Sequence, residues 1–338
     1  MVLEGTRISH RAFSDLPEYL RTGDVLVLNE TRVIAARLFG RLLRPGAPDD
    51  DAGARVEILL LHPSDRMRYD AGSSRWSALV KPGRKLPAGA RVSFHGPGDA
   101  CELLGTATVT RALERGLRDL EFALTLPFER FLERAGRLPL PPYVRNDTER
   151  TRERYQTVFA REPGSVAAPT ASLHFTTALL EALCAKGVEI VKLVLDVGLG
   201  TFRPMQTERI EEHEMHAESF AIPQATAGAI ARAKHEGRRV VAAGTTVVRA
   251  LEGSAAGAGT VRAGEGRTNL FVTPGFRFQI VDALITNFHL PRSTLLVLAS
   301  AFAGHDNIRR AYREAVDREY RFFSFGDAMF IEPAGYER

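Results

Sequence analysis

Cysteine is scarce in this chain of 338 residues, where only Cys101 and Cys184 occur, far apart in the sequence. Two distant cysteines exclude a disulfide scaffold and an all-cysteine zinc site, and they fit a reducing cytosol. No apolar run approaches the roughly 18 residues that span a bilayer. The N-terminus, MVLEGTRISH, lacks the basic and apolar segments of a signal peptide. We therefore expect a cytoplasmic protein that has no membrane partner.

Neither sign of charge dominates. The chain has 45 Lys and Arg residues and 41 Asp and Glu residues, which gives a formal net charge of +4. Apolar residues make up 44% and charged residues 25%, which excludes the collagen-like, disordered and membrane classes. The length predicts two domains. The isoelectric point of about 9.2 gives weak support to an anionic partner such as RNA.

The first half of the chain contains short apolar segments separated by Pro, Gly, Asp and Ser clusters. These segments predict strands at residues 24–29, 33–43, 55–61, 76–81, 91–94, 105–109 and 119–126. Such spacing is typical of a small barrel or sandwich, which we place at residues 32–126. We expect strand 24–29, in the region 1–31, to join the α/β sheet of the second half, so that the barrel is an insertion.

The second half alternates between helical and strand patterns. It predicts helices at 177–186, 224–236, from 245, at 293–303 and at 307–320, and strands at 188–197, 239–243, 281–286 and 328–331. The Gly/Ala-rich stretch 256–266 is expected to be a loose hairpin or loop. We predict an α/β fold for residues 127–338, with a mainly parallel sheet, helices, and ligands at the carboxyl ends of the strands.

Four polar junctions lie between these elements, at residues 167–176, 196–202, 244–249 and 286–293. Free N–H groups at helix starts bind anions, and glycines let the backbone approach a ligand closely. Taken singly, Thr245, Thr246 and Ser293 are ordinary helix N-caps. Four such junctions at one sheet edge favour a ligand pocket.

Two nucleotide-binding motifs are incomplete or missing. Gly198-Leu199-Gly200 lacks the third glycine of the dinucleotide fingerprint, and no helix follows at once. The chain contains neither a GxxxxGK[ST] phosphate loop nor an HExxH zinc motif. A Rossmann-type NAD site is therefore only weakly indicated.

The segment EEHEMH (211–216) is rich in groups that bind metals or transfer protons. His213 and His216 are three residues apart and share a face if the segment is helical. With Glu212 they could hold a metal, but no spacing indicates a further ligand, so we favour a general base or a substrate contact. His174 and His289 adjoin phenylalanines. Each could be an ordinary core histidine, but both lie in the polar junctions, which favours a functional role.

A stiff connector follows the barrel segment. The prolines of LPLPPYV (138–144) hold the chain extended. It is either a plain domain hinge or, through Tyr143, a stacking surface for a substrate. Arg154 and its neighbouring arginines follow it, and Lys81, Arg84 and Lys85 flank a turn in the barrel segment. Both groups could be solvated surface or could contact phosphates.

Long blocks stand in the same order as in one known family. They are GDVLVLNETRVIAARLFG (23–40), WSALVKPGRKL (76–86), LPLPPYV (138–144), RYQTVFA (154–160), GSVAAPTASLHFT (164–176), GLGTFRP (198–204), EHEMHAE (212–218), GTTVVRALE (244–252), VDALITNFHLPRSTLL (281–296) and YRFFSFGDAMFI (320–331). The chain thereby resembles the S-adenosylmethionine:tRNA ribosyltransferase-isomerases of queuosine biosynthesis over nearly its whole length.

The chain also departs from the family's usual pattern. Ser172, Asp196 and Leu199 stand where the family commonly has glycine, histidine and alanine. An imidazole role at position 196 is therefore not expected here. The family usually has a further segment before the strand in which this chain begins, so residues 1–31 are expected to be a truncated N-terminal region.

The resemblance implies a reaction and its participants. The ribosyl part of S-adenosylmethionine, a co-substrate, is transferred to 7-aminomethyl-7-deazaguanine at the wobble position of tRNA. Adenine and methionine leave, and the product base is epoxyqueuosine. The sulfonium is itself the electrophile, so neither a metal nor a prosthetic group is implied. We expect a monomer.

The resemblance also implies roles for individual residues. His213 or His216 would be the base, and His174 or His289 would assist adenine departure. The methionine carboxylate would bind Arg249 and the helix start at Thr245 and Thr246, while Gly198, Gly200 and Thr201 would pass close to the ribose. Asp282 and Asp327 could orient the sugar or the deazaguanine, and a structural role for them is an equal alternative. Tyr143 and Arg154, singled out above, are the other candidate substrate contacts.

Two other function classes remain as alternatives. One is a non-catalytic RNA-binding protein with the barrel as its platform, which would bind tRNA without releasing adenine. The other is a metal-dependent hydrolase built on residues 212–216, which would contain stoichiometric zinc and lose activity to a chelator. The polar junctions lie in the α/β half, which argues against the first, and neither class accounts for the collinear blocks.

Overall fold

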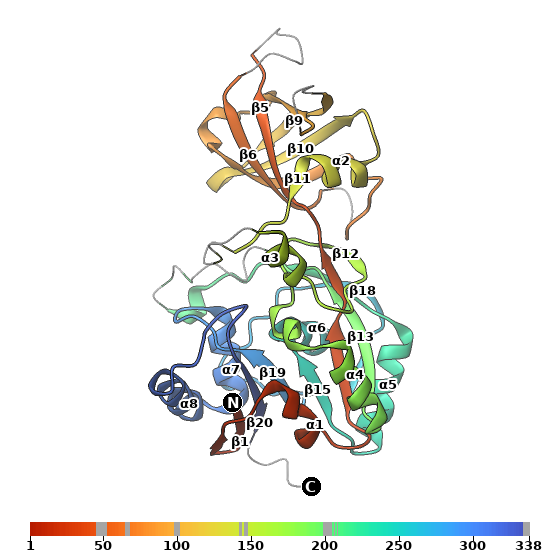
Figure 1. The fold of residues 1–338 in the computed structure, drawn as a ribbon, viewed down its shortest axis with the longest axis vertical. Coiled ribbons are helices and arrows are strands. Elements are labelled where there is room, and N and C mark those ends of the chain that lie inside the picture. The colour runs from red at the N-terminus through yellow and green to blue at the C-terminus, as the bar shows by residue number, and fades with distance from the viewer. Residues whose placement is uncertain are drawn as a thin grey trace. The chain divides into compact units, whose positions relative to one another are not determined.

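The computed structural model describes residues 1–44, 53–64, 68–97, 102–141, 144, 148–198, 205, 207 and 209–333. The chain divides into two compact units (Figure 1). The α/β unit comprises Met1–Arg32, Glu153–Glu162 and Ala168–Arg338, and the barrel unit comprises Val33–Arg152 and Pro163–Ala167. The barrel unit therefore interrupts the α/β unit in sequence, and it continues past residue 126, where we had placed its end.

Nine strands form the sheet of the α/β unit, in the order β18-β14-β13-β3-β15-β19-β20-β1-β2. In chain order they are β1 (Val2–Glu4), β2 (Arg7–Ser9), β3 (Val25–Asn29), β13 (Glu189–Leu195), β14 (Glu218–Ile222), β15 (Val240–Ala243), β18 (Gly264–Thr268), β19 (Ala283–Asn287) and β20 (Ala328–Glu332). The predicted parallel arrangement is confirmed for the four central strands, β13, β3, β15 and β19. Antiparallel pairs flank them on both sides, so the whole sheet is mixed.

The centre of this sheet is apolar on both faces. All residues of β3, β15 and β19 are buried, as expected for parallel strands that are covered on both sides. β3 lies between β13 and β15, so the N-terminal segment supplies a central strand.

Helices and short elements connect these strands. They are η1 (Phe13–Asp15), α1 (Leu16–Tyr19), η4 (Thr170–His174), α4 (Thr177–Ala185), η6 (Ile210–Glu212), α5 (Gln224–His235), α6 (Thr245–Gly253), α7 (Thr294–Ala303), α8 (His305–Asp317) and the hairpin β16 (Ala255–Gly257) with β17 (Thr260–Val261). Side-chain caps begin two of the helices, because Thr176 accepts a hydrogen bond from the Leu179 N–H at 3.1 Å and Ser293 accepts one from the Leu296 N–H at 3.2 Å. The hairpin β16–β17 lies in the stretch 256–266, which was expected to be a loose hairpin or loop, and β18, which pairs with β14, begins at its end.

Six antiparallel strands close into the barrel. They are β5 (Arg37–Leu42), β6 (Arg55–Pro63), β7 (Arg75–Lys81), β8 (Arg91–His95), β9 (Leu103–Ala112) and β10 (Leu117–Leu124), and pairing of β5 with β8 completes the circle. The short elements η2 (Gly83–Lys85) and η3 (Glu114–Gly116) lie between strands, and β11 (Gly136–Arg137) adds to β5.

Helix α2 (Phe128–Ala135) explains why the barrel unit extends beyond residue 126. Its Phe128, Phe131 and Leu132 are buried in the core of the barrel. The Phe128 ring stacks on Trp76, with ring centroids 5.1 Å apart. Burial of such side chains stabilises each by roughly 1.5–3 kcal/mol, so the helix belongs to the barrel core.

Three short elements lie where the chain passes between the units in sequence. They are β4 (Thr31–Val33) and β12 (Glu162–Ser165), which pair with each other, and α3 (Glu149–Arg154). Among the helices in the described ranges, none has the length and hydropathy needed to cross a membrane.

Candidate active site

The four polar junctions meet at the carboxyl edge of the α/β sheet. Each of them contributes to one small pocket, lined by Ala168, Pro169, Thr170, Ala171, Val197, Gly244, Thr245, Thr246, Thr286, Asn287, His289 and Leu295. The pocket has a volume of about 30 Å³, enough for a water or a carboxylate group. The convergence follows from topology, because the carboxyl ends of neighbouring parallel strands share one edge.

The start of helix α6 forms one wall of this pocket. Gly244 precedes the helix with φ of 101°, a conformation that favours glycine. Thr245 and Thr246 occupy the first turn and are buried. In the described part of the chain, the buried Thr246 Oγ1 has no hydrogen-bond partner. An unpaired buried hydroxyl costs roughly 1–3 kcal/mol, and a helix start attracts anions, so this wall is suited to an anionic group that would pair with the hydroxyl.

A chain of side-chain hydrogen bonds forms a second wall. Asn287 Nδ2 donates to Thr170 Oγ1 at 3.0 Å, and Asn287 Oδ1 accepts from His174 Nε2 at 2.9 Å. This arrangement makes Nε2 the protonated nitrogen of the neutral ring and leaves Nδ1 as the acceptor. Burial lowers the pKa of His174, although the bond to Asn287 opposes this. His174 is therefore an uncharged proton acceptor at neutral pH.

His289 occupies a more enclosed position. Its Nε2 lies 2.7 Å from Thr286 Oγ1, and its backbone N–H donates to the Tyr312 hydroxyl at 2.8 Å. Burial lowers the pKa of His289 to about 4 and raises the pKa of Tyr312. His289 is consequently neutral, and it is a weaker proton carrier at neutral pH than His174.

Arg249, which we expect to hold the methionine carboxylate, has a buried side chain that forms an ion pair with Glu218. It also donates from Nε to the Leu270 carbonyl at 3.1 Å, and Glu218 accepts the Gly198 N–H at 3.1 Å. Arg249 thus joins α6 to β14 and, through Glu218, to the backbone at Gly198, and its carboxylate role stays a prediction.

The two histidines of the EHEMH segment differ in their surroundings. His213 packs edge-on against Phe271, with ring centroids 5.4 Å apart, and its pKa is lowered by burial and by His216. His216 is exposed, and its carbonyl accepts a hydrogen bond from Arg249 at 3.4 Å. No group of three His, Cys, Asp or Glu side chains that could hold a metal occurs among the residues that the structure describes.

The structure places the other expected site residues outside the small pocket. Asp282 precedes β19. Its Oδ1 accepts a hydrogen bond from Lys234 Nζ at 2.8 Å, and its Oδ2 accepts one from the Val240 N–H at 2.8 Å. This is the amino end of the parallel strands, where Asp282 links two strands and α5, as its structural alternative requires. Its substrate contact stays a prediction. Arg154 is exposed, with its guanidinium carbon 5.3 Å from the centre of the Phe325 ring. Gly200, Thr201 and Tyr143 lie outside the described residues.

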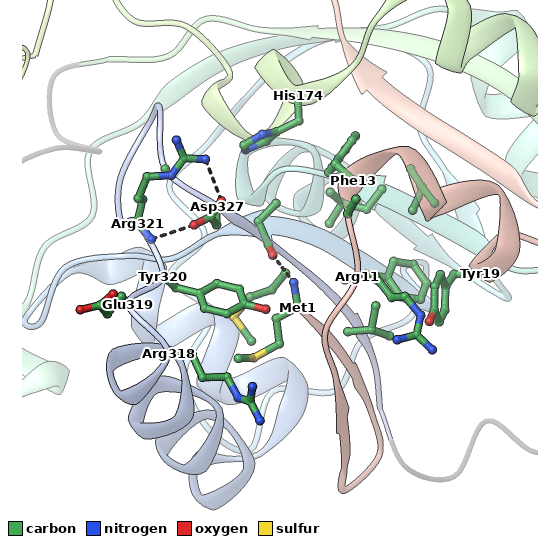
Figure 2. Close-up of a pocket in the computed structure, with 18 residues that line it drawn as sticks. Met1, Arg11, Phe13, Tyr19, His174, Arg318, Glu319, Tyr320, Arg321 and Asp327 are labelled. Atoms are coloured by element: carbon green, nitrogen blue, oxygen red, sulfur yellow. Dashed lines mark hydrogen bonds and ion pairs between the residues drawn. The ribbon is translucent and has the colours of Figure 1, made fainter.

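A larger cavity lies beside His174 in the same unit. It measures about 520 Å³ and is bordered by aromatic side chains that include Phe13, Tyr19 and Tyr320. Figure 2 shows Asp327 turned toward Arg321, which donates to it from Nη2 at 3.1 Å and from the backbone N–H at 2.8 Å. Burial raises the pKa of Asp327, but these bonds outweigh that effect and lower it overall. The His174 ring stacks on Phe13 in this cavity, with centroids 5.1 Å apart.

Three polar residues of the site were not singled out from the sequence. Asn287 and Thr170 lie in the expected junctions, and Glu218 ends the block EHEMHAE. The signal of Asn287 was a polar residue in an otherwise apolar stretch, whereas Glu218 stands among other polar residues and had no such signal. The partners of Asn287 and Glu218 lie far away along the chain, which hid their roles.

Comparisons with known proteins agree with this architecture. A family model described as queuosine biosynthesis protein matches residues 1–331. The S-adenosylmethionine:tRNA ribosyltransferase-isomerase of Symbiobacterium thermophilum is 53% identical over 324 residues, which are 96% of this chain and 89% of the relative. The enzyme of that name from Thermus thermophilus is 51% identical over 326 residues, 96% of this chain and 89% of the relative.

A solved structure is similar as well. The crystal structure of an S-adenosylmethionine tRNA ribosyltransferase from Thermotoga maritima superposes with a TM-score of 0.50 at 37% identity, and the match covers 98% of this chain and 91% of that one. From the family match over nearly the whole sequence, the chain belongs to the queuosine biosynthesis protein family.

Proposed function

We propose that this chain transfers the ribosyl part of S-adenosylmethionine to 7-aminomethyl-7-deazaguanine in tRNA and isomerises it, so that epoxyqueuosine forms while adenine and methionine leave. Relatives about half identical to it over nearly their full length carry the name of this enzyme. The structural observation that carries the site assignment is the unpartnered, buried Thr246 hydroxyl where all four polar junctions meet.

The methionine end of S-adenosylmethionine is assigned to the start of α6. Its carboxylate fits the small pocket, where Thr246 Oγ1 would donate a hydrogen bond and the helix start would stabilise the negative charge. A hydrogen bond to a charged group is worth roughly 1.5–3 kcal/mol. Gly198 lies beside this region, and its N–H is held by Glu218.

The chemistry needs a group that takes up one proton and gives one back. The sulfonium acidifies the hydrogens on the neighbouring 5′ carbon of the ribose, so a base can remove one of them. Departing adenine then needs a proton. The amine of the modified base adds to the sugar, and an epoxide closes as the methionine thioether leaves. General acid–base catalysis of such steps contributes about 10²–10⁴-fold.

His174 meets this need better than His289. Its neutral ring has Nδ1 as an acceptor, and the imidazolium formed there is supported by Asn287 on Nε2. His289 has a pKa of about 4 and so resists protonation at neutral pH. His213 is the second candidate base, because its lowered pKa also keeps it neutral.

The test is adenine release by the purified chain. S-adenosylmethionine, metal-free buffer and tRNA that contains 7-aminomethyl-7-deazaguanine are mixed, and adenine is followed by chromatography. The proposal requires stoichiometric adenine that depends on the modified tRNA. Tight tRNA binding with no adenine would instead favour the non-catalytic RNA-binding alternative.

We also propose that the chain acts as a monomer in the cytoplasm and needs no metal. Sedimentation during turnover conditions tests the oligomeric state. A dimer that remained fully active at concentrations where it cannot dissociate would contradict the proposal that the chain acts as a monomer.

A further inference from the structure

The charge of the protein is distributed unevenly between its two units. The barrel unit contains 20 basic and 15 acidic residues, a net charge of +5, whereas the α/β unit contains 25 basic and 26 acidic residues, a net charge of −1. The excess positive charge of the chain therefore belongs to the barrel unit, although the polar junctions belong to the other.

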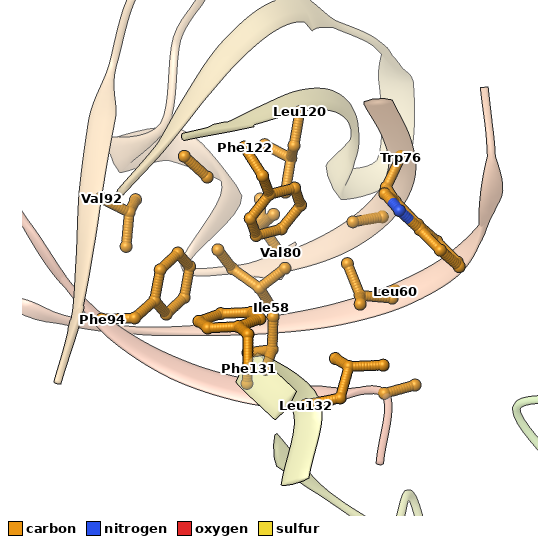
Figure 3. Close-up of a cluster of buried hydrophobic side chains, with 14 of the residues drawn as sticks. Ile58, Leu60, Trp76, Val80, Val92, Phe94, Leu120, Phe122, Phe131 and Leu132 are labelled. Carbon is orange, nitrogen blue, oxygen red and sulfur yellow. The ribbon is translucent and has the colours of Figure 1, made fainter. Parts of the chain in front are cut away.

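Arginines gather on the outer side of three neighbouring barrel strands. Alternate residues of these strands point into the core, where Ile58 and Leu60 are packed (Figure 3), so the residues between them face outward. We define the arginine face as four arginines and one phenylalanine on the outward side of β11, β5 and β6: Arg37, Phe39, Arg41, Arg55 and Arg137.

The register sets like charges opposite one another on this face. Arg137 is paired with Arg37 across β11 and β5, and Arg41 is paired with Arg55 across β5 and β6. Like charges directly opposite in a sheet are destabilising. The repetition of this unfavourable pairing is not explained by stability of the barrel, and an anion bound between the arginines would relieve it.

Phe39 holds two of these guanidinium groups in place. The Cζ atoms of Arg55 and Arg137 lie 4.4 Å and 5.3 Å from the centre of its ring. Stacking on an aromatic ring orders a guanidinium group and leaves its N–H groups at the edge, free to donate. Arg41 makes one weak bond, from Nη1 to the Gly53 carbonyl at 3.4 Å.

The exposed arginines of this face lack carboxylate partners, unlike Arg75 and Arg111 on other barrel strands. In the described ranges, Arg41, Arg55 and Arg137 form no ion pair, while Arg37 reaches Glu57 at 3.3 Å. On other strands, Arg75 pairs with Glu121 at 3.1 Å and Arg111 with Asp119 at 3.7 Å. Positive charge is thus left uncompensated on the arginine face.

We propose that the arginine face binds the phosphate backbone of the tRNA substrate, an inference that rests on the proposed function for the identity of the RNA. Arg37 and Arg41 are four residues apart, or roughly 13 Å along the strand, so the face can contact several phosphates of one RNA strand. Arginine suits this role because its fork of N–H groups matches phosphate oxygens. Contacts to phosphate position an RNA without reading its sequence.

The test compares two sets of substitutions in the full chain. The triple variant Arg41→Gln, Arg55→Gln and Arg137→Gln removes the three uncompensated charges. We expect the Kd for tRNA to rise about tenfold or more, and the slope of log Kd against log salt to fall by about 2 to 3, since each neutralised phosphate contributes about 0.9 in duplexes and 0.7 in single strands. The KM for tRNA should rise in parallel, with kcat at saturating tRNA and the KM for S-adenosylmethionine unchanged.

The control is the double variant Arg75→Gln and Arg111→Gln, whose arginines are compensated by carboxylates. Its Kd should stay within about twofold of the wild-type value, as expected for charges that contact no phosphate. The single variant Arg41→Gln, which leaves the stack on Phe39 intact, should reduce the salt slope by about 1. Wild-type affinity and slope in both the triple and the single variant would overturn the proposal.

Other results separate the sources of failure. A wild-type chain that binds tRNA through these arginines but releases no adenine would contradict the proposed function and leave the arginine face supported. Vesicles of anionic lipid provide the competing polyanion. If the triple substitution weakened binding to vesicles but not to tRNA, the face would be a lipid surface and our proposal would be wrong.

Discussion

The imidazole Nε2 of His174 lies 2.9 Å from the amide Oδ1 of Asn287, across 113 residues of sequence. His174 ends η4, and Asn287 ends β19. Because Asn287 lines the small pocket and His174 lines the larger cavity, this one hydrogen bond connects the small pocket with the larger cavity beside it. It also sets which ring nitrogen carries the proton.

Substitution Asn287→Asp tests that relationship. A carboxylate beside His174 favours the imidazolium and raises its pKa, so more of the enzyme holds a charged ring near neutrality. We expect the acid limb of the pH–rate profile to move upward by about one unit or more, with activity lost at a higher pH than in the wild type. Asn307→Asp, the same change where the amide donates to the Ala303 carbonyl, should leave the profile unmoved.

Thr246→Val tests the carboxylate pocket. Valine keeps the shape but removes the hydroxyl, and that hydroxyl has no partner in the described structure to lose. We expect the KM for S-adenosylmethionine to rise about tenfold, the loss of one charged hydrogen bond, with no fall in thermal stability. The control Thr226→Val breaks a 2.6 Å bond to the Lys192 carbonyl, which should cost about 1 kcal/mol of stability and leave KM unchanged.

A different result would place S-adenosylmethionine in the larger cavity and contradict its assignment to α6. If Asp327→Asn and Arg321→Met raised the KM for S-adenosylmethionine while Thr246→Val did not, the methionine carboxylate would not bind at α6. The co-substrate would then belong to the cavity that borders Phe13 and Tyr320.

The pH dependence of stability follows from His289. Its folded pKa of about 4 lies below the ordinary value of 6.5, so the unfolded chain binds more protons between those values. Stability is therefore complete above about pH 6.5 and is lost as the pH falls toward 4, by roughly 3 kcal/mol from this group. Urea unfolding at pH 7.5 and 4.5 should show a smaller loss in His289→Asn than in the wild type. His305→Asn, at an exposed position, should behave as the wild type.

A buried ion pair between Arg239 and Asp24 joins β15 to β3 at the amino ends of these strands. Arg239 contacts Asp24 at 2.5 Å and Glu332 at 2.7 Å, and it donates to the Tyr19 carbonyl at 3.0 Å. Arg239→Met leaves the Asp24 carboxylate buried and unpaired, which should cost about 3–5 kcal/mol in denaturant unfolding. Adding Asp24→Leu should recover part of that loss. Arg238→Met, which breaks less buried pairs, should cost no more than about 1 kcal/mol.

Removal of metals should leave the reaction unchanged. The sulfonium of S-adenosylmethionine is already an electrophile, so the proposed steps use only proton transfer and a carboxylate site. Dialysis against EDTA, followed by the adenine assay, should give the untreated rate. A rate lost to the chelator and restored by zinc would instead support the metal-dependent alternative at residues 212–216.

Local sequence patterns were sufficient to predict the main elements of the α/β unit. The apolar run at 24–29 predicted a strand of this sheet, which is β3, and the helix predicted at 177–186 is α4. The meeting of four junctions at one edge followed from parallel topology alone. The small barrel was likewise indicated by short strands with turn residues between them.

The side-chain partners were not predictable in the same way. The partner of Arg249, Glu218, comes from an antiparallel strand whose position the sequence does not reveal. The bonds of Asp282 to Lys234 and to the Val240 N–H likewise depend on which strands are neighbours. α2 joined the barrel through Phe128 and Phe131, whose partners depend on how that core closes.

The position of β3 has a consequence for synthesis on the ribosome. β3 emerges early, but its neighbours β13 and β15 begin only at Glu189 and Val240. The barrel, which is nearly continuous from Val33 to Arg152, is translated in between and can close first. The apolar strand β3 is thus synthesised well before its neighbouring strands, and the barrel can fold in the meantime. Such delayed pairing slows folding and exposes the nascent chain to aggregation.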